Sequence, residues 1–119
     1  MQFAMLIYQG TTPLPNTEAW EALPEDEQNK IYADYAAINK NPAVTPGVAL
    51  GLSVNAKTVR VESGKTIATE GPFAGVEAAV GGYLVFEAED EAAALDFAAT
   101  IPAARLGGAI EVRPVGTYW

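Results

Sequence analysis

The sequence predicts an α+β domain in which two helices cover one face of an antiparallel sheet. Three observations predict this class: alternating apolar strands near both ends of the chain, two helical segments with apolar stripes, and glycine or proline breaks between them. With 119 residues, the chain can build one core but is short for two. We therefore expect a single domain over residues 1–119.

The first strand is expected over residues 2 to 9. Its two alternating sets are both apolar, which is typical of a strand at the centre of a sheet: Phe3, Met5 and Ile7 on one side, and Ala4, Leu6 and Tyr8 on the other. The loop Gly10 to Pro15 follows and is the best candidate for a lid or rim.

Two helices are predicted from their start signals. Pro24 and the acids Glu25 to Glu27 begin the first, because proline suits the first turn and acids suit the positive end of the helix dipole. Trp20 lies before it, in a short separate turn. Asp90 caps the second helix, which is expected over Glu91 to Thr100.

The apolar stripe of the first helix consists of Ile31, Tyr35 and Ile38, which recur at helical spacing. Tyr32 lies beside this stripe. It is expected either to face a pocket or to be buried at the helix edge.

Between the helices, Pro46-Gly47 is expected to introduce a strand over Val48 to Val54. The runs Lys57 to Val61 and Lys65 to Thr69 flank a Ser-Gly turn, which predicts a β-hairpin.

Gly71-Pro72 then breaks the chain before a central strand over Gly82 to Glu89. Gly81-Gly82 makes either a bulge or room for a neighbouring backbone or a ligand. The last strand is expected over Ala109 to Val115. The apolar end Tyr118-Trp119 is expected to dock on its own chain or on a partner.

Without the hairpin, the order of elements is the β-α-β-β-α-β pattern of the ferredoxin-like fold. Both helices then lie on one face of the sheet, yet the strands carry apolar residues on both faces. Something must shield the second face from water. A second copy of the chain is the simplest cover, so we expect a homodimer.

Composition excludes several classes of function. Fifteen acids against seven bases give a net charge of −8, which disfavours nucleic acid and anionic membrane surfaces. Histidine and cysteine are absent, so disulfides, zinc thiolate sites and thiol nucleophiles are impossible. We expect no metal or other cofactor. With no signal peptide or membrane-spanning run evident, we expect a cytoplasmic protein.

An ordered set of short motifs resembles the YCII-related (DGPF-domain) family over nearly the whole chain. These motifs are Met5 to Tyr8, Thr58 to Val61, Thr69 to Ala74, Gly81 to Tyr83, Ile101 to Arg105 and Ile110 to Val115. The resemblance implies a fold of the dimeric α/β-barrel type. It also implies a regulatory partner such as a sigma factor, because such proteins often accompany the family.

The chain departs from the family pattern at two places. Glu70 replaces the family's name-giving aspartate, and the polar segment after Phe73 is reduced to Gly75, Val76, Glu77 and Ala78. Some YCII-type proteins resemble enzymes that use a His–Asp pair. That mechanism is excluded here because the chain has no histidine.

Polar groups on the strands and in the central turn are the candidate site residues. Glu70 is the candidate catalytic base, since a glutamate in an apolar cleft can have a raised pKa. Arginines and a tyrosine would suit a carboxylate or phenolate ligand. The candidate ligand contacts are Tyr8, Arg60, Glu77, Tyr83 and Arg105. Glu111 and Arg113 on the last strand are expected to converge on the same cleft.

Structural roles explain the same residues equally well. Arg60 with Glu62, and Glu111 with Arg113, can form strand ion pairs, and Arg105 follows a helix end. Three functions therefore stay open: a small-molecule-binding or regulatory accessory module, a cofactor-free isomerase, lyase or dehydrohalogenase acting on a small phenolic or cyclic acid, and a purely structural oligomer.

Overall fold

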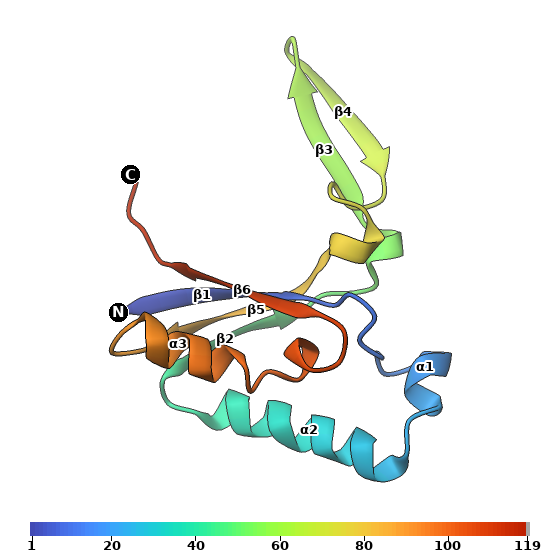
Figure 1. The fold of residues 1–119 in the computed structure, drawn as a ribbon. Coiled ribbons are helices and arrows are strands. Elements are labelled where there is room, and N and C mark those ends of the chain that lie inside the picture. Colours follow the sequence, from blue (N-terminus) through green and yellow to red (C-terminus); the bar gives the residue numbers. More distant parts are fainter. Residues whose placement is uncertain (119) are drawn as a thin grey trace.

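A four-stranded antiparallel sheet forms the centre of the computed structural model, which describes residues 1–118 apart from the side chain of Glu77 (Figure 1). The strand order is β2-β5-β1-β6, and β3 and β4 form a separate two-stranded sheet. The strands are β1 (Gln2–Tyr8), β2 (Val44–Ala49), β3 (Lys57–Glu62), β4 (Lys65–Glu70), β5 (Val80–Glu87) and β6 (Ala109–Pro114). The helices are α1 (Glu18–Glu21), α2 (Glu25–Lys40) and α3 (Glu91–Ala98), with 3-10 turns at Ser53–Asn55, Val76–Ala78 and Pro102–Ala104.

This order of elements confirms the predicted mixed α+β class and the position of the inserted hairpin. The two strands expected at the centre of the sheet, β1 and β5, pair with each other over most of their length, from Gln2 with Glu87 to Ile7 with Gly82. The apolar residues on both faces of these strands predicted their central position. In the single chain, however, only the side with Phe3, Met5 and Ile7 is buried, and Leu6 and Tyr8 on the other side stay partly exposed.

The helices begin where their start signals lie. The Asp90 carboxylate accepts a hydrogen bond from the Ala93 N–H at 2.9 Å and caps α3. Pro24 precedes α2, whose first turn carries three acids. The side-chain amide of Gln28 donates to the Trp20 carbonyl at 2.9 Å, which holds α1 against the start of α2.

The strand predicted over Val48 to Val54 is wrong in position: β2 runs from Val44 to Ala49, and Pro46-Gly47 lies inside it. Pro46 stands opposite Leu84, and the pairing shifts register before Ala49 meets Gly82. A proline is tolerated there because β2 is an edge strand, so the missing N–H need not serve an inner neighbour.

The β3–β4 hairpin is confirmed and stands away from the rest of the molecule (Figure 1). Its two-residue turn has φ of 49° at Ser63 and 76° at Gly64, the left-handed geometry that matches the twist of a two-residue hairpin. All residues of β4 and all of β3 except Thr58 are exposed. An isolated two-stranded hairpin is marginally stable in water.

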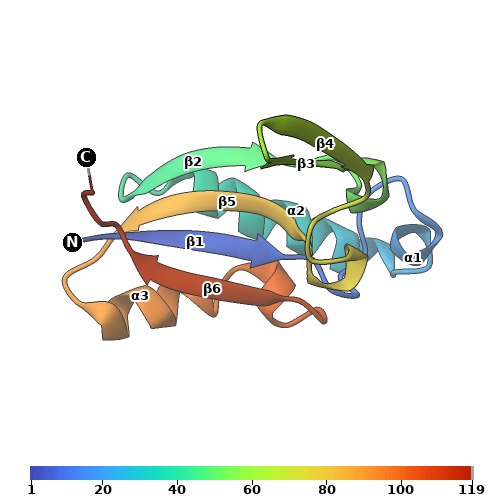
Figure 2. The ribbon, with the colours of Figure 1, turned by 90° about the horizontal axis from the view of Figure 1, so that it is seen from above.

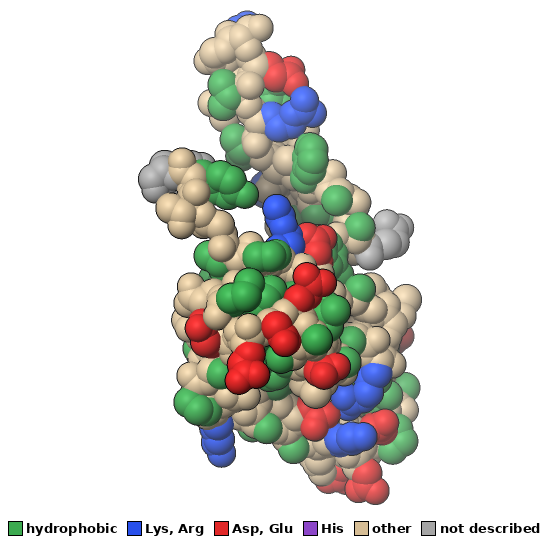
Figure 3. All heavy atoms as spheres, turned by 60° about the vertical axis from the view of Figure 1, so that its left-hand side comes forward, with side chains coloured by type: hydrophobic (Ala, Val, Ile, Leu, Met, Phe, Trp, Pro, Cys, Tyr) green, Lys and Arg blue, Asp and Glu red, His purple; other side chains and the backbone are tan. Residues whose placement is uncertain are grey.

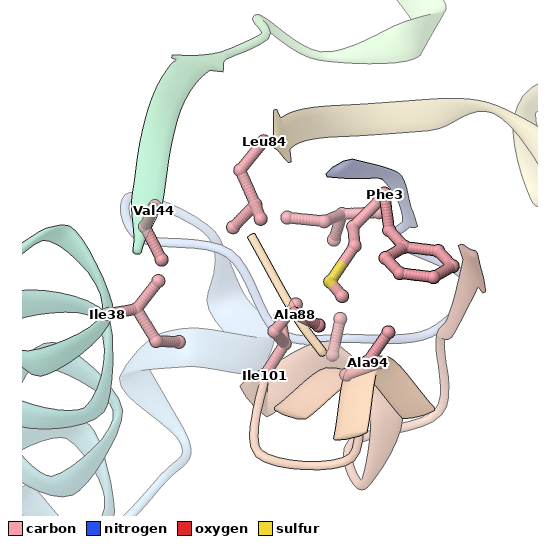
Figure 4. Close-up of a cluster of buried hydrophobic side chains, with 11 residues drawn as sticks. Phe3, Ile38, Val44, Leu84, Ala88, Ala94 and Ile101 are labelled. Carbon is pink, nitrogen blue, oxygen red and sulfur yellow. The ribbon is translucent and has the colours of Figure 1, made fainter. Parts of the chain in front are cut away.

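The core lies between the sheet and the helices (Figure 4). From the sheet, Phe3 and Leu84 point toward the helical layer, and Met5 belongs to the same buried cluster. Phe86 and Phe97 stack with ring centroids 3.9 Å apart. The alanines of α3 let the helix lie close to the strands, and Ala94 is fully buried.

The opposite face of the sheet has no helix over it among the described residues, as Figure 2 shows from above. We call it the open face and define it by Ala4, Leu6, Tyr8, Tyr83 and Val85 with the outward residues of β2 and β6. The hairpin and residues 115–118 rise on the same side (Figure 1). Tyr118 is 83% exposed, whereas Trp119 lies outside the described residues, so its expected docking stays a prediction.

Replacing Met5 by alanine should lower the free energy of unfolding by about 2–5 kcal/mol, because the side chain is fully buried and a cavity would remain. Urea denaturation followed by circular dichroism measures the change. The matched control is Leu95→Ala on the exposed side of α3, where we expect a change within about 0.5 kcal/mol. Equal losses in the two variants would contradict the assignment of the core.

Candidate functional site

A cavity of about 340 Å³ lies between α2 and the helix-side face of the sheet, and the Gln9–Pro15 loop borders it. The sheet contributes Ile7 and Leu84, and α2 contributes its predicted apolar stripe. The cavity is lined mainly by apolar and aromatic groups, among them Ile7, Trp20, Ile31, Tyr35, Ile38 and Leu84. Its size and composition are typical of a small-molecule site.

The loop expected as a lid or rim borders this cavity with Thr12, Pro13, Leu14 and Pro15. Backbone hydrogen bonds hold it in place, since the Thr11 N–H donates to Gly107 at 3.2 Å and the Thr12 N–H donates to Gln9 at 2.9 Å. The Thr17 hydroxyl donates to the Leu14 carbonyl at 2.6 Å, at the start of α1. The loop is therefore tied at both ends.

Aromatic side chains form the wall at the N-terminal half of α2. Trp20 is 4% exposed and meets Tyr32 edge to face, with ring centroids 5.2 Å apart. Tyr32 lines the cavity while half of it remains exposed, which agrees with the pocket-facing alternative for this residue. Edge-to-face pairs of this kind hold rings in defined positions.

Tyr35 supplies a polar group deeper in the wall. Burial raises the pKa of its phenol above the ordinary value of 10.0, while a hydrogen bond with the Ala103 backbone and the charge of Arg105 act in the opposite direction. The phenol therefore stays protonated and neutral over the physiological range. Sequence reasoning placed Tyr35 in the core stripe and missed its contact with the cavity.

The glycine pair forms the predicted bulge and borders the cavity. The pairing of β1 with β5 passes from Ile7–Gly82 to Tyr8–Val80, so Gly81 is the extra residue of a bulge. A side chain at Gly81 would collide with Gln9. A Cβ at Gly82 would lie 3.9 Å from the Ile7 Cδ1, on the side where the cavity is.

The polar groups of the lining are uncharged. They belong to Gln9, Thr12, Tyr32, Tyr35, Asn39 and Tyr83, of which Tyr83 directs its side chain to the open face, and the part of the lining that the structure describes contains no acid, lysine or arginine. The Thr12 Oγ1 is buried and has no hydrogen-bond partner among the described residues.

The candidate catalytic residue Glu70 lies outside this cavity, at the end of β4. The Lys57 Nζ donates to its Oε2 at 2.6 Å, and the Glu70 side chain is 81% exposed. Arg60 pairs with Glu62 on the hairpin at 2.9 Å. Both pairs are solvated, and the pair of Arg60 with Glu62 matches the structural alternative for Arg60.

The other candidate site residues lie in separate parts of the structure. On the open face, the Tyr8 hydroxyl donates to Glu111 at 3.3 Å, and Glu111 lies 3.9 Å from Arg113. Arg105 pairs with Asp34 of α2 at 3.0 Å and joins the turn after α3 to that helix. Among the candidates whose side chains the structure describes, Tyr83 alone borders the cavity, although its side chain belongs to the open face.

The side chain of Glu77 lies outside the described residues, so its predicted ligand contact stays a prediction. A single copy of the chain does not bring Glu70 together with an arginine or Tyr83 in one described cavity.

A second hollow of about 480 Å³ lies at the base of the hairpin and is widely open to solvent. It is lined by Leu50, Leu52, Pro72 and Phe73 among others, and Phe73 is 80% exposed. The turn with Pro72 and Phe73, which carries the family-like motif Thr69 to Ala74, therefore forms an exposed apolar surface and not an enclosed site.

Two further features of the described residues bear on function. No group of three or more acids gathers among residues 1–118 in a way that could hold a metal ion. Within the same part of the chain, every helix is too short or too polar to cross a membrane.

Comparison with known proteins identifies the family. The YCII-related domain matches residues 1–118, so the chain belongs to the YCII-related domain family, as the motifs indicated. An uncharacterized protein of Rhizobium meliloti (strain 1021) is 28% identical over 123 residues, which cover 99% of this chain and 94% of that protein. Neither comparison names an activity.

The buried phenol of Tyr35 predicts a specific pH dependence. Above pH 10.0 an unfolded tyrosine loses its proton while the folded Tyr35 keeps it, so the folded state binds more protons and the free energy of unfolding falls as the pH rises. The wild type should lose stability above this pH more steeply than Tyr35→Phe. Urea denaturation between about pH 9 and 11 measures the two slopes.

The control for this experiment is Tyr32→Phe, which removes a hydroxyl from the same wall but retains Tyr35. Its stability should decline as steeply as that of the wild type. Identical slopes in the wild type and in Tyr35→Phe would show that the burial of this phenol does not affect stability.

Proposed function

We propose that this YCII-related protein is a homodimeric module that binds a small organic molecule in the cavity between α2 and the sheet. The observation that carries the proposal is the cavity itself: about 340 Å³, lined mainly by apolar and aromatic side chains and bordered by a tied loop. Sites for small molecules have this size and this mixture of apolar walls with a few polar groups.

The ferredoxin-like fold is part of the proposal. The order β2-β5-β1-β6, with a helix-containing connection from β1 to β2 and another from β5 to β6, supports it. In the dimeric α/β-barrel arrangement that we propose, two such sheets pack face to face about a two-fold axis.

Exposed apolar surface supports the dimer. On the open face, Leu6 and Val85 are only partly covered and Tyr83 is 46% exposed. The hairpin adds Val59 and Val61, each more than half exposed, and Figure 3 shows it standing clear of the body. Apolar groups gathered on one side of a molecule mark a contact surface.

A second copy would also stabilise the hairpin. The β3–β4 pair makes no packed layer with the rest of its own chain, and two strands alone are marginally stable. Because it rises on the side of the open face, it can reach a copy that packs there (Figure 1).

Binding is favoured over catalysis by the chemistry of the lining. The cavity offers no described acid or base, and Glu70 is in an exposed ion pair instead of an apolar cleft. A regulatory protein partner, which the family resemblance implied, stays a prediction.

The dimer predicts that the wild type has twice the 12.5 kDa mass of the chain in light scattering. Val85→Glu places a charge on the open face of a central strand, where two copies would bury it unpaired. The dissociation constant of the dimer should therefore rise by at least about a hundredfold.

Leu95→Glu is the matched control, because it puts the same charge on the exposed side of α3, on the helical layer of the molecule. It should leave the mass unchanged. A monomeric wild type, or dissociation by both substitutions, would overturn the arrangement.

The cavity predicts that Gly82→Val blocks ligand binding while the protein stays folded. The added side chain would point toward the cavity, and its Cβ would come no closer than 3.4 Å to the nearest atom, the Val48 carbonyl oxygen. Thermal shifts with a panel of phenols, aromatic hydrocarbons and aromatic acids should appear for the wild type and vanish in this variant.

Gly51→Val is the control substitution, since a Cβ at Gly51 meets nothing within 4 Å and the residue does not line the cavity. It should keep the ligand response of the wild type. Loss of the response in both variants would point to a general effect on the fold and not to the cavity.

A further inference from the structure

The two sides of the β3–β4 hairpin differ in chemistry. Residues that stand opposite each other in an antiparallel pair point to the same side of it. The pairing of β3 with β4 therefore gathers small and apolar side chains on one side: Val59, Val61, Thr66 and Ala68. We call this side the apolar face of the hairpin. The opposite side is more polar, since Arg60 and Glu62 form their ion pair there.

The apolar face is bare in the single chain. Val59 and Val61 are 62% and 67% exposed, and every residue of β4 is exposed as well. The hairpin is a sheet of its own, with no third strand beside it among the described residues. Because two strands alone are marginally stable, a surface that covers the apolar face would also stabilise the hairpin.

The position and the length of the hairpin suit a second copy on the open face. The hairpin rises at one end of the sheet, on the side of the open face (Figure 1). Each of its strands has six residues, which corresponds to a length of about 20 Å. Sheets that pack face to face lie about 10 Å apart. The hairpin therefore extends past the sheet of a copy that packs there and reaches its helical layer.

Charge distinguishes the hairpin from the rest of the chain. Residues 57–70 hold three of the seven bases and two of the fifteen acids, so their net charge is +1 and that of the other residues is −9. Lys65, next to the turn, has no ion pair among the described residues. A basic segment of an otherwise acidic chain is attracted to the acidic part of another copy.

The helical layer of such a copy is acidic at both of its ends. At the end nearer the hairpin, the first turn of α2 carries Glu25, Asp26 and Glu27 (Figure 1). At the other end, Asp90 and Glu91 begin α3. Figure 3 shows acidic side chains gathered over that second end. The turn of the hairpin would thus meet acids at either end of the partner's helical layer.

We propose, on the basis of the proposed homodimer, that the hairpin is an arm that docks on the partner copy. Its apolar face packs against the partner, and its turn with Lys65 lies near an acidic end of the partner's helical layer. Each copy then covers the hairpin of the other. Burial of the apolar face supplies the attraction, and the basic turn selects an acidic surface.

Val59→Glu and Ile67→Glu test the arm, because they place the same charge on opposite sides of one hairpin. Val59→Glu should raise the dissociation constant of the dimer at least about tenfold, since the charge would be buried without a partner. Ile67→Glu should change it by less than about twofold. Sedimentation over a dilution series measures both constants, and circular dichroism melting curves establish that the variants are folded.

Lys65→Glu tests the charge of the turn. At low ionic strength it should raise the dissociation constant about tenfold. The difference from the wild type should disappear near 1 M NaCl, where the Debye length is about 3 Å. A loss of affinity that persists at this salt concentration, or no loss at low salt, would contradict the contact with an acidic surface.

Hydrogen exchange observes the docked hairpin directly. Amides of β3 and β4 in the wild type should exchange at least about tenfold more slowly above the dissociation constant of the dimer than below it. Val85→Glu weakens the dimer at the open face and leaves the hairpin unchanged. At the higher concentration, its hairpin amides should exchange as fast as those of the diluted wild type.

The outcomes separate the arm from the homodimer. If the wild type is a dimer but its hairpin amides exchange equally fast at both concentrations, the arm is wrong and the open face alone forms the dimer. Equal dissociation constants in Val59→Glu and Ile67→Glu would lead to the same conclusion. If the wild type is a monomer, both the arm and the proposed homodimer are overturned.

Discussion

The antiparallel pairing of β1 with β5 is the constraint on which the rest of the structure depends. It places Met5 opposite Leu84 in the core and Leu6 opposite Tyr83 on the open face. Since side chains alternate along a strand, a slip by one residue would exchange the two faces and expose Met5, which is fully buried. One register thus decides both the core and the surface that a second copy would cover.

The cavity arises where this regular pairing ends. The bulge at Gly81 interrupts the ladder beside Ile7, and the chain then leaves the sheet into the loop that borders the cavity. Bulges re-aim strands and are common beside functional sites. Here the bulge, the bare backbone of Gly82 and the apolar stripe of α2 together leave space that the core residues do not fill.

The same sheet also separates charge from the cavity. The ion pairs of Glu70, Arg60 and Glu111 are all on the hairpin or the open face, whereas the described lining residues of the cavity are uncharged. Among the described residues, one ion pair on the helical side joins Arg105 to Asp34. It is partly buried, so it fixes the position of α2 against the turn after α3. This ion pair therefore helps to fix the α2 side of the cavity.

The sequence by itself determined the α+β class, the two central strands, the helix starts and the hairpin, because these depend on local periodicity and on residues such as Asp90, Ser63 and Gly64. It did not place β2, since Pro46 breaks a strand in most contexts and is accepted here only at a sheet edge. Only the tertiary structure decided the site. It brought Thr12, Trp20 and Tyr35 to one cavity and left Glu70 in solvent, because the chemistry of a site depends on which distant segments meet.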